Sequence, residues 1–251
     1  MNPEPLNHMD SLLPIFPLPN VVLFPNVFLP LHIFEPRYRE MVADAVANDR
    51  LIGMVLLRPG WEHDYEKQPP VYPIGCSGVM THVEQLADGR YNIVLRGIDR
   101  FRILEEDYRR SYRRAAVEPL AEGEPAAEDR AVIRLQRSKL EGLLAPAIER
   151  DLRTSTRLAR PEPVEGRHAQ GAPSQTRSGI RHPQSADLKI PTAMPDEDLD
   201  NALAQYLDFE PLEKQALLEQ QNLRARAESL VELLEMKILI ARTPGVSTVA
   251  H

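Results

Sequence analysis

Short apolar runs, broken by proline, glycine and Asp-Gly, fill the first half of the chain from Leu12 to about Leu120. Apolar runs interrupted in this way are typical of an irregular β-rich domain, because proline, glycine and Asp-Gly end strands and form turns. Asp88-Gly89 predicts a hairpin with a type I′ turn. The predicted strands are Ile15–Leu18, Val21–Phe24, Val27–Leu31, Leu51–Leu57, Gly75–Leu86, Tyr91–Leu95, Phe101–Glu105 and Tyr112–Glu118.

A helical period interrupts this region once, directly after Glu35 and Pro36. Proline favours the first turn of a helix, where its missing N–H group is not needed. The apolar residues that follow the spacing i, i+3, i+4, i+7, i+8 are Tyr38, Met41, Val42, Ala45 and Val46. We therefore expect one short helix within the β-rich half.

After Leu120 the pattern changes to apolar residues every three to four positions, in a background of alanine, glutamate and arginine. The predicted helices are Glu124–Ile148, Asp198–Leu207, Pro211–Gln220 and Leu223–Arg242, and Thr243-Pro244-Gly245 ends the last. The sequence thus predicts an α+β protein, with a β-rich subdomain over residues 12–120 and a helical subdomain over residues 124–245.

One segment within the helical half does not fit this pattern. Ala159 to Asp187 contains only six apolar residues of 29 and is rich in Pro, Gly, Ser, Gln and Arg, so it buries too little to fold by itself. Arg160 to Arg167 resembles the translation of an interspersed palindromic repeat element of the kind that inserts into bacterial genes. We expect a disordered insertion at about residues 153–190, and a functional linker is the alternative.

The overall composition is that of a globular protein, with 43% hydrophobic and 27% charged residues and a net charge of −7. The acidic balance argues against a protein that mainly coats nucleic acid or anionic lipid. Cys76 is the single cysteine, so no internal disulfide forms and a reducing compartment is expected. The N-terminus lacks the pattern of a signal peptide, and prolines break the most apolar stretch. We expect a cytoplasmic protein with no membrane contact.

Motifs for common chemistries are missing from the sequence. No lysine follows a glycine, which excludes a phosphate-binding P-loop, and the histidines and lone cysteine have no zinc-site spacing. Gly75-Cys76-Ser77-Gly78 has its second glycine one residue too early for a nucleophile elbow. Small residues at the start of a strand are the favoured interpretation of this motif. We expect no catalytic residues, no metal site and no cofactor.

Arginines and tyrosines alternate between Tyr108 and Arg114, a composition that RNA-binding surfaces also use. Strand alternation divides these arginines between two faces, and Glu105, Glu106 and Asp107 precede them. We therefore favour a salt-bridged strand edge over an RNA-binding site.

Three segments resemble the N-terminal, substrate-binding domain of Lon protease. They are Phe16–Arg39 (FPLPNVVLFPNVFLPLHIFEPRYR), Ile74-Gly75 at the start of a long strand, and Leu86–Phe101 (LADGRYNIVLRGIDRF). The helical part from Leu199 through Leu212-Glu213-Lys214-Gln215 to Arg242 resembles that domain more weakly. The FEPRYR form is similar to that of free-standing bacterial members. The resemblance implies a PUA-like, β-rich pseudo-barrel followed by a helical bundle.

The resemblance also implies a protein that binds unfolded or partner polypeptide independently of ATP, because the ATPase and peptidase modules of Lon have no counterpart here. RNA binding through the PUA-like fold is the alternative function. The expected binding surface comprises Phe34, Glu35, Arg37 and Tyr38, with Trp61 from a long loop. A large aromatic on a loop and an arginine fork are suited to holding a bound chain. The other interpretation is that Phe34 and Tyr38 are core, Arg37 pairs with a nearby acid and Trp61 caps the barrel.

Overall fold

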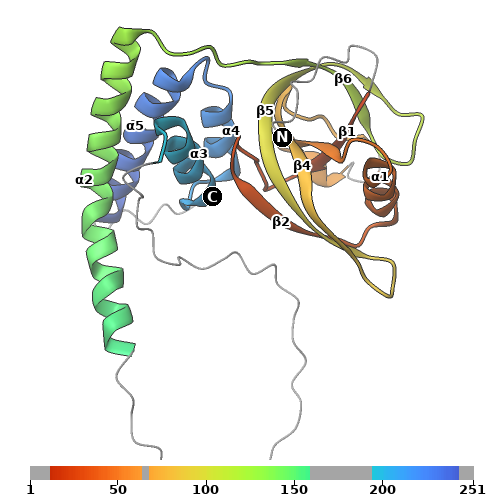
Figure 1. The fold of residues 1–251 in the computed structure, drawn as a ribbon, viewed down its shortest axis with the longest axis horizontal. Helices are drawn as coiled ribbons and strands as arrows, with labels where there is room; N and C mark the ends of the chain where they lie inside the picture. Colours follow the sequence, from red (N-terminus) through yellow and green to blue (C-terminus); the bar gives the residue numbers. More distant parts are fainter. Residues whose placement is uncertain (1–11, 64–67, 159–193, 243–251) are drawn as a thin grey trace, which may run out of the picture.

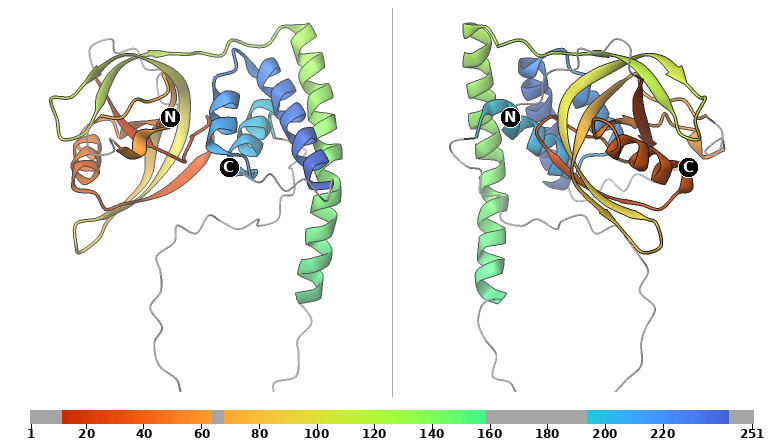
Figure 2. Two further views of the ribbon diagram at one scale, coloured as in Figure 1. Left: turned by 180° about the vertical axis from the view of Figure 1, so that it is seen from behind. Right: turned by 45° about the vertical axis from the view of Figure 1, so that its right-hand side comes forward.

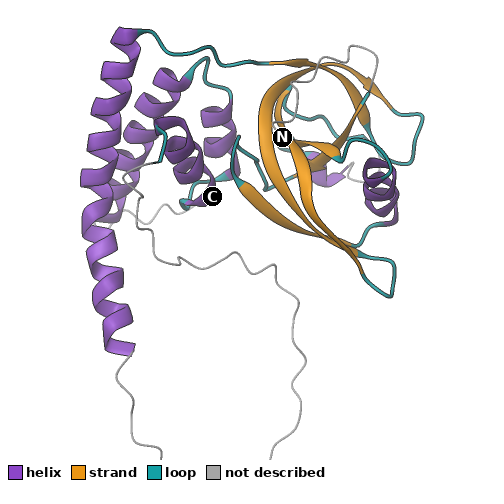
Figure 3. Cartoon of the chain, in the orientation of Figure 1, coloured by secondary structure: helices purple, strands orange, loops and turns teal. Residues whose placement is uncertain are grey.

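The computed structural model describes residues 12–63, 68–158 and 194–242. A strand-rich half and a helical half lie side by side (Figures 1 and 3), which confirms the α+β class. The elements are β1 (Leu13–Leu18), β2 (Phe28–Ile33), α1 (Pro36–Val46), β3 (Leu51–Leu56), the 3-10 helix η1 (Trp61–His63), β4 (Ile74–Gln85), β5 (Tyr91–Asp107), β6 (Arg114–Pro119), α2 (Ala127–Leu158), α3 (Asp196–Tyr206), α4 (Pro211–Leu218) and α5 (Leu223–Arg242).

The strands form one sheet that closes on itself. Their order is β2-β5-β4-β3-β1-β6, and β6 also pairs with β5, so β5, β4, β3, β1 and β6 make a ring. β1 and β3 are parallel, and the other pairings are antiparallel. Closure leaves β2 as an edge strand, paired only with the first part of β5.

Alternate residues of the ring strands converge on a compact interior. Phe101 of β5 is fully buried there, and its ring occupies the space above two glycines. A Cβ at Gly53 or at Gly75 would lie 2.8 Å from the tip of the Phe101 ring. The remaining buried members of this barrel-interior cluster are Leu13, Ile15, Val55, Leu57, Val71 and Ala115. The sheet closes tightly because its strands carry small residues where the phenylalanine is large.

A second, larger cluster packs outside the ring. It joins α1, the outward side chains of the strands and the helical half into one apolar core. α1 lies on the side of the ring away from the other helices, and the C-terminal part of α2 projects past α5 (Figures 1 and 2). Within the described ranges, none of the helices combines the length and the apolar character that crossing a bilayer requires.

Several sequence predictions need correction. Val21–Phe24 is not a strand: it has no regular secondary structure, and its apolar side chains enter the larger core. The two predicted strands Tyr91–Leu95 and Phe101–Glu105 are one continuous strand, β5, which bends at bulges in its pairing with β4 and β6. The Asp88-Gly89 hairpin is confirmed, but only Gly89 has a positive φ (80°), so the turn is not type I′.

Each predicted helix is present in the part of the chain that the structure describes, and most of the ends are shifted. α5 has the predicted bounds, whereas α2 begins at Ala127 and continues to Leu158, beyond the predicted end at Ile148. The helix thus enters the range expected for the insertion, and that range from residue 159 to residue 190 lies outside the described residues.

A buried polar cluster joins the two halves. Arg100 of β5 and Arg226 of α5 both bind one carboxylate, that of Glu122 in the segment between β6 and α2. Arg226 is fully buried and also donates to the side chain of Asn201 on α3 (3.0 Å). Arg100 donates to the carbonyl of Leu218 at the end of α4 (2.8 Å). Strand, linker and three helices therefore meet at these two guanidinium groups.

Candidate binding site

A cavity of about 220 Å³ lies between the start of α1 and the loop that joins β5 to β6. Arg37 and Tyr38 line it from α1, and Tyr108, Arg110 and Tyr112 line it from the loop. The walls are therefore arginine forks and aromatic rings, which are groups that bind main-chain carbonyls, carboxylates and apolar side chains. The cavity brings together two segments that are far apart in the sequence.

The guanidinium of Arg37 is held in place on two sides. Its Nε donates to Oε2 of Glu35 (3.0 Å), and Nη2 lies 2.9 Å from the same oxygen. Its Cζ stands 4.6 Å from the centre of the Tyr38 ring, a cation–π contact. Tyr38 is buried, and its ring packs 4.4 Å from that of Phe16. Because Glu35 precedes the Pro36 that begins α1, the start of the helix sets the position of the arginine.

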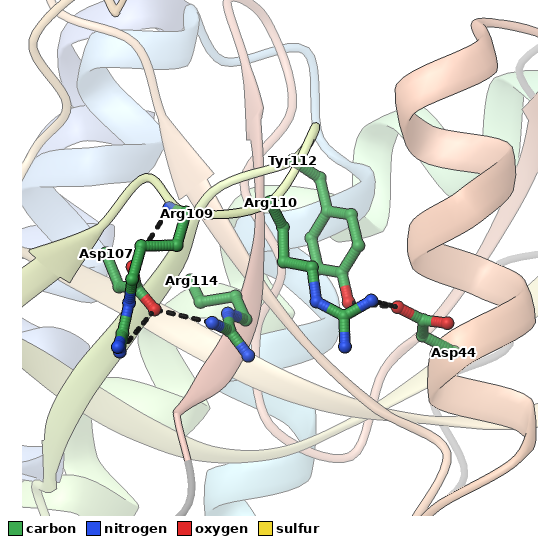
Figure 4. Close-up of polar contacts among 6 residues, drawn as sticks. All are labelled: Asp44, Asp107, Arg109, Arg110, Tyr112 and Arg114. Carbon is green, nitrogen blue, oxygen red and sulfur yellow. Dashed lines mark hydrogen bonds and ion pairs between the residues drawn. The ribbon is translucent and has the colours of Figure 1, made fainter.

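The β5–β6 loop is fastened to α1 at a single carboxylate. Arg110 Nη1 and the Tyr112 hydroxyl both donate to Oδ2 of Asp44, at 3.1 and 2.7 Å (Figure 4). Burial and the neighbouring Asp44 raise the pKa of Tyr112 to about 12, so its hydroxyl stays protonated and keeps donating. These contacts fix the loop wall of the cavity relative to the helix wall.

The other arginines of the loop region are also paired with acids. Arg109 and Arg114 both bind Asp107 (Figure 4), and Arg113 binds Glu106. Hydrogen bonds from Arg109 are the main reason that the pKa of Asp107 lies well below its usual range. The predicted ion pairing is confirmed. The predicted strand alternation is wrong, because residues 108–113 form a loop and β6 begins only at Arg114.

The structure brings only part of the predicted surface together. Glu35, Arg37 and Tyr38 are adjacent, with Tyr38 in the core and Arg37 paired with an acid. Phe34 is 62% exposed and stacks on His32 outside the cavity lining (ring centres 6.4 Å apart). Trp61 begins η1 and packs, partly buried, against the barrel-interior cluster. The sequence did not indicate Asp44 as a site residue, because its partners Arg110 and Tyr112 are 66 and 68 positions away in the chain. The sequence singled out Tyr108 and Tyr112 only as part of a strand edge, and not as a wall of this cavity.

The small residues at the start of β4 have structural contacts. Ser77 is buried and its hydroxyl donates to the carbonyl of Asp99 (3.1 Å). Cys76 is fully buried, and this burial raises the pKa of its thiol far above the ordinary range. A thiol that is kept protonated and away from solvent is a poor nucleophile. These placements agree with the structural interpretation of the motif.

A family model and several related sequences point to the same protein family. Residues 12–236 match the model of the ATP-dependent protease La (LON) substrate-binding domain. Lon protease of Anaeromyxobacter dehalogenans (strain 2CP-C) is 28% identical over 230 residues, and Lon protease 2 of Myxococcus xanthus is 29% identical over 230 residues. Each alignment covers 91% of this chain and 24% of the relative, so the chain spans about a quarter of the length of these proteases.

A solved structure supports the same fold. The N-terminal domain of Mycobacterium avium complex Lon protease superposes with a TM-score of 0.57 at 14% sequence identity. The superposition covers 90% of this chain and 98% of that domain. The arrangement of ring and helical half is therefore shared at the level of the fold.

Proposed function

The chain belongs to the family of Lon substrate-binding domains, and from this we propose that it binds exposed polypeptide segments and has no ATPase or peptidase activity of its own. It acts as a recognition module for unfolded or partner polypeptide, in the cytoplasm. The observation that carries the proposal is the cavity at the start of α1, where Arg37 and Tyr38 face the β5–β6 loop.

The cavity has the properties of a preformed recognition site. Its arginine is held by Glu35 and by the Tyr38 ring, so little side-chain freedom is lost when a carbonyl or carboxylate of a bound chain reaches it. The aromatic walls accept apolar side chains of many shapes. A small site of this kind fits contact with a short segment of an unfolded chain rather than with a folded surface.

RNA binding, the alternative, draws on the same loop. Its arginines are engaged by Asp44, Glu106 and Asp107, which leaves little positive charge for a phosphate backbone. The chain as a whole carries a net charge of −7. The structure therefore favours polypeptide as the ligand.

A binding assay with nuclease treatment tests the proposal. The probe is reduced and carboxymethylated α-lactalbumin, with native α-lactalbumin as the matched folded control. We expect the purified chain to retain the unfolded probe, with and without nuclease, and to neither hydrolyse ATP nor cleave casein. Retention that disappears after nuclease treatment would favour the RNA alternative, and ATP-dependent casein cleavage by rigorously pure protein would refute the non-catalytic part.

A further inference from the structure

A buried carboxyl group lies on the inner side of α3, among the other helices. α3 packs against α2, α4 and α5, and the side chain of Asp200 is buried there. Its Oδ2 atom has no hydrogen-bond partner within the described part of the chain. A neutral carboxyl group tolerates such a place, whereas a buried carboxylate without a partner is costly. The packing of α3 therefore depends on whether Asp200 carries a proton.

Charged side chains approach Asp200 from α2, from α5 and from its own helix. Those that act on it are Arg137 of α2, Arg226 of α5, and Asp196 and Glu197 of α3. Lys214 of α4 reaches the other end of α3, where it donates to the carbonyl of Gln205 (2.7 Å). Burial is the largest effect and raises the pKa of Asp200 from 3.8 to about 7. The group therefore gains and loses its proton close to neutral pH.

The two arginines that act on Asp200 are already bound to other acids. Arg226 binds the carboxylate of Glu122 in the segment between β6 and α2. Arg137 Nη1 lies 2.9 Å from Oδ1 of Asp196. A carboxylate formed at Asp200 must compete for one of these guanidinium groups, because a buried charge that stays uncompensated is strongly destabilising. The competition requires a change in the position of α3.

The opposite side of α3 holds the strand-rich half at the point where β2 begins. Oδ1 of Asp198 accepts a hydrogen bond from Nδ2 of Asn26 (2.9 Å). The Tyr206 hydroxyl donates to the carbonyl of Phe28 (3.0 Å). Positions two apart in a helix are separated by about 200° around its axis, so Asp198 and Asp200 lie on opposite sides. α3 thus connects the buried carboxyl group to the start of β2.

The strand side of these two contacts is fixed by the sheet. Asn26 has a left-handed backbone (φ 60°), which asparagine adopts more readily than most residues, and its N–H donates to the carbonyl of Gly97 (3.0 Å). Phe28 is paired with Arg96 in the β2–β5 register. Because neither residue can follow a movement of the helix, a shift of α3 weakens both hydrogen bonds.

We propose that Asp200 is a proton switch: loss of its proton to solvent shifts α3 and weakens the two hydrogen bonds that join this helix to the start of β2. The carboxylate keeps the electron pair of the broken O–H bond and competes with Glu122 for Arg226. Protonation reverses the change, so that α3 is held firmly below neutral pH and more loosely above it. This device goes beyond the proposed function, because it requires neither the cavity nor a bound polypeptide.

NMR titration of the full chain between about pH 5 and pH 9 tests the switch. The reporters are the side-chain amide of Asn26 and the backbone amide of Leu29, which shares its peptide group with the Phe28 carbonyl. Each should show a chemical-shift step with a midpoint at about pH 7, and the Cγ carbon of Asp200 should titrate with the same midpoint. In Asp200→Asn both steps should be lost. Asp208→Asn, at an exposed position after α3, is the matched control and should keep both.

Two further variants separate this switch from other causes. Histidine ordinarily titrates in the same range, and His32 lies on β2, so His32→Gln should keep both steps. Tyr206→Phe should remove the Leu29 step and leave the Asn26 step, because it deletes only one of the two hydrogen bonds.

Three results would overturn the inference: a step that persists unchanged in Asp200→Asn, a Leu29 step that persists unchanged in Tyr206→Phe, or an Asp200 carboxyl group that titrates below about pH 5. Melting curves identify a misfolded variant. If Asp200→Asn does not fold, the wild-type titration of Asp200 and the Tyr206→Phe variant decide the result. None of these outcomes depends on the binding of unfolded protein, so the proposed function stands or falls separately.

Discussion

The guanidinium of Arg100 lies 2.7 Å from the carboxylate of Glu122, with only 4% and 14% of the two side chains exposed. Burial lowers the pKa of Arg100, and Glu122 acts in the opposite direction, toward a higher pKa. The same carboxylate binds the fully buried Arg226. One acid thus compensates two arginines at the junction of the strand-rich and helical halves. Removing it would leave two buried positive charges next to each other.

Glu122→Gln is therefore expected to lower the free energy of unfolding by about 3–5 kcal/mol, the range found when one partner of a buried ion pair is removed. Urea denaturation followed by circular dichroism measures the change. Glu118→Gln is the control, because its ion pair with Arg102 is 3.5 Å long and both side chains are half exposed. Its effect should stay below about 1 kcal/mol. Equal effects of the two variants would contradict the role given to Glu122.

Asp200 on α3 predicts a dependence of stability on pH. Burial raises its pKa from 3.8 to about 7; Arg226 and Arg137 lower it, and Asp196 and Glu197 raise it further. Between these two values the folded state keeps a proton that the unfolded state has lost. The free energy of unfolding should therefore decrease as pH rises from about 4 to about 7.

Asp200→Asn should remove this part of the decrease, so that the variant gains stability relative to the wild type as pH rises. Urea denaturation at several pH values measures it. Asp208→Asn, at an exposed position after α3, is the matched control and should follow the wild-type profile. A decrease that persists unchanged in Asp200→Asn would show that another group causes it.

Gly97 is required by a close approach of two chain segments. A Cβ at this position would lie 2.0 Å from the carbonyl oxygen of Phe24. Gly97→Ala should therefore force the backbone apart and destabilise the fold by about 1–3 kcal/mol. Gly142 in α2 has no atom within 4 Å of its Cβ position, so Gly142→Ala should stabilise the protein by about 0.5–1 kcal/mol through helix propensity. A higher melting temperature for Gly97→Ala, or a lower one for Gly142→Ala, would contradict these two expectations.

Much of this fold follows from local patterns in the sequence. Pro36 and the apolar spacing after it predict α1, and Asp88-Gly89 predicts the hairpin between β4 and β5, because both depend on residues close in sequence. The length of β5 does not follow locally. The middle of β5 contains Gly97, and a glycine within an apolar run suggests the end of a strand. In the folded chain this glycine instead allows the close approach of the Phe24 carbonyl.

The candidate site was less accessible to such reasoning. Arg37 and Tyr38 are marked by their place at a helix start, but the opposite wall depends on Asp44 binding Arg110 and Tyr112 across the fold. Trp61 looks like a free loop aromatic in the sequence, whereas the barrel-interior cluster, assembled from distant strands, gives it a packing partner. Tertiary contacts of this kind leave no periodic trace along the chain.

Trp61 and Arg37 should consequently behave differently when each is replaced by alanine. Trp61→Ala removes packing from the barrel-interior cluster and should lower the free energy of unfolding by about 1–3 kcal/mol, with binding of unfolded protein retained. Arg37→Ala changes a partly exposed side chain and should leave the melting temperature nearly unchanged. Loss of binding without loss of stability in Trp61→Ala would place the tryptophan in the site after all.

The central claim is that the Arg37 cavity recognises polypeptide, and an anisotropy titration of labelled, reduced and carboxymethylated α-lactalbumin tests it most directly. The account predicts that the wild-type chain binds this probe and does not bind native α-lactalbumin. Arg37→Ala should weaken binding of the probe about tenfold. Arg102→Ala should leave binding unchanged, because the Arg102 side chain is 52% exposed and lies outside the cavity. The central claim would be contradicted if the wild-type chain did not bind the probe, or if Arg37→Ala bound it as tightly as Arg102→Ala and the wild type do.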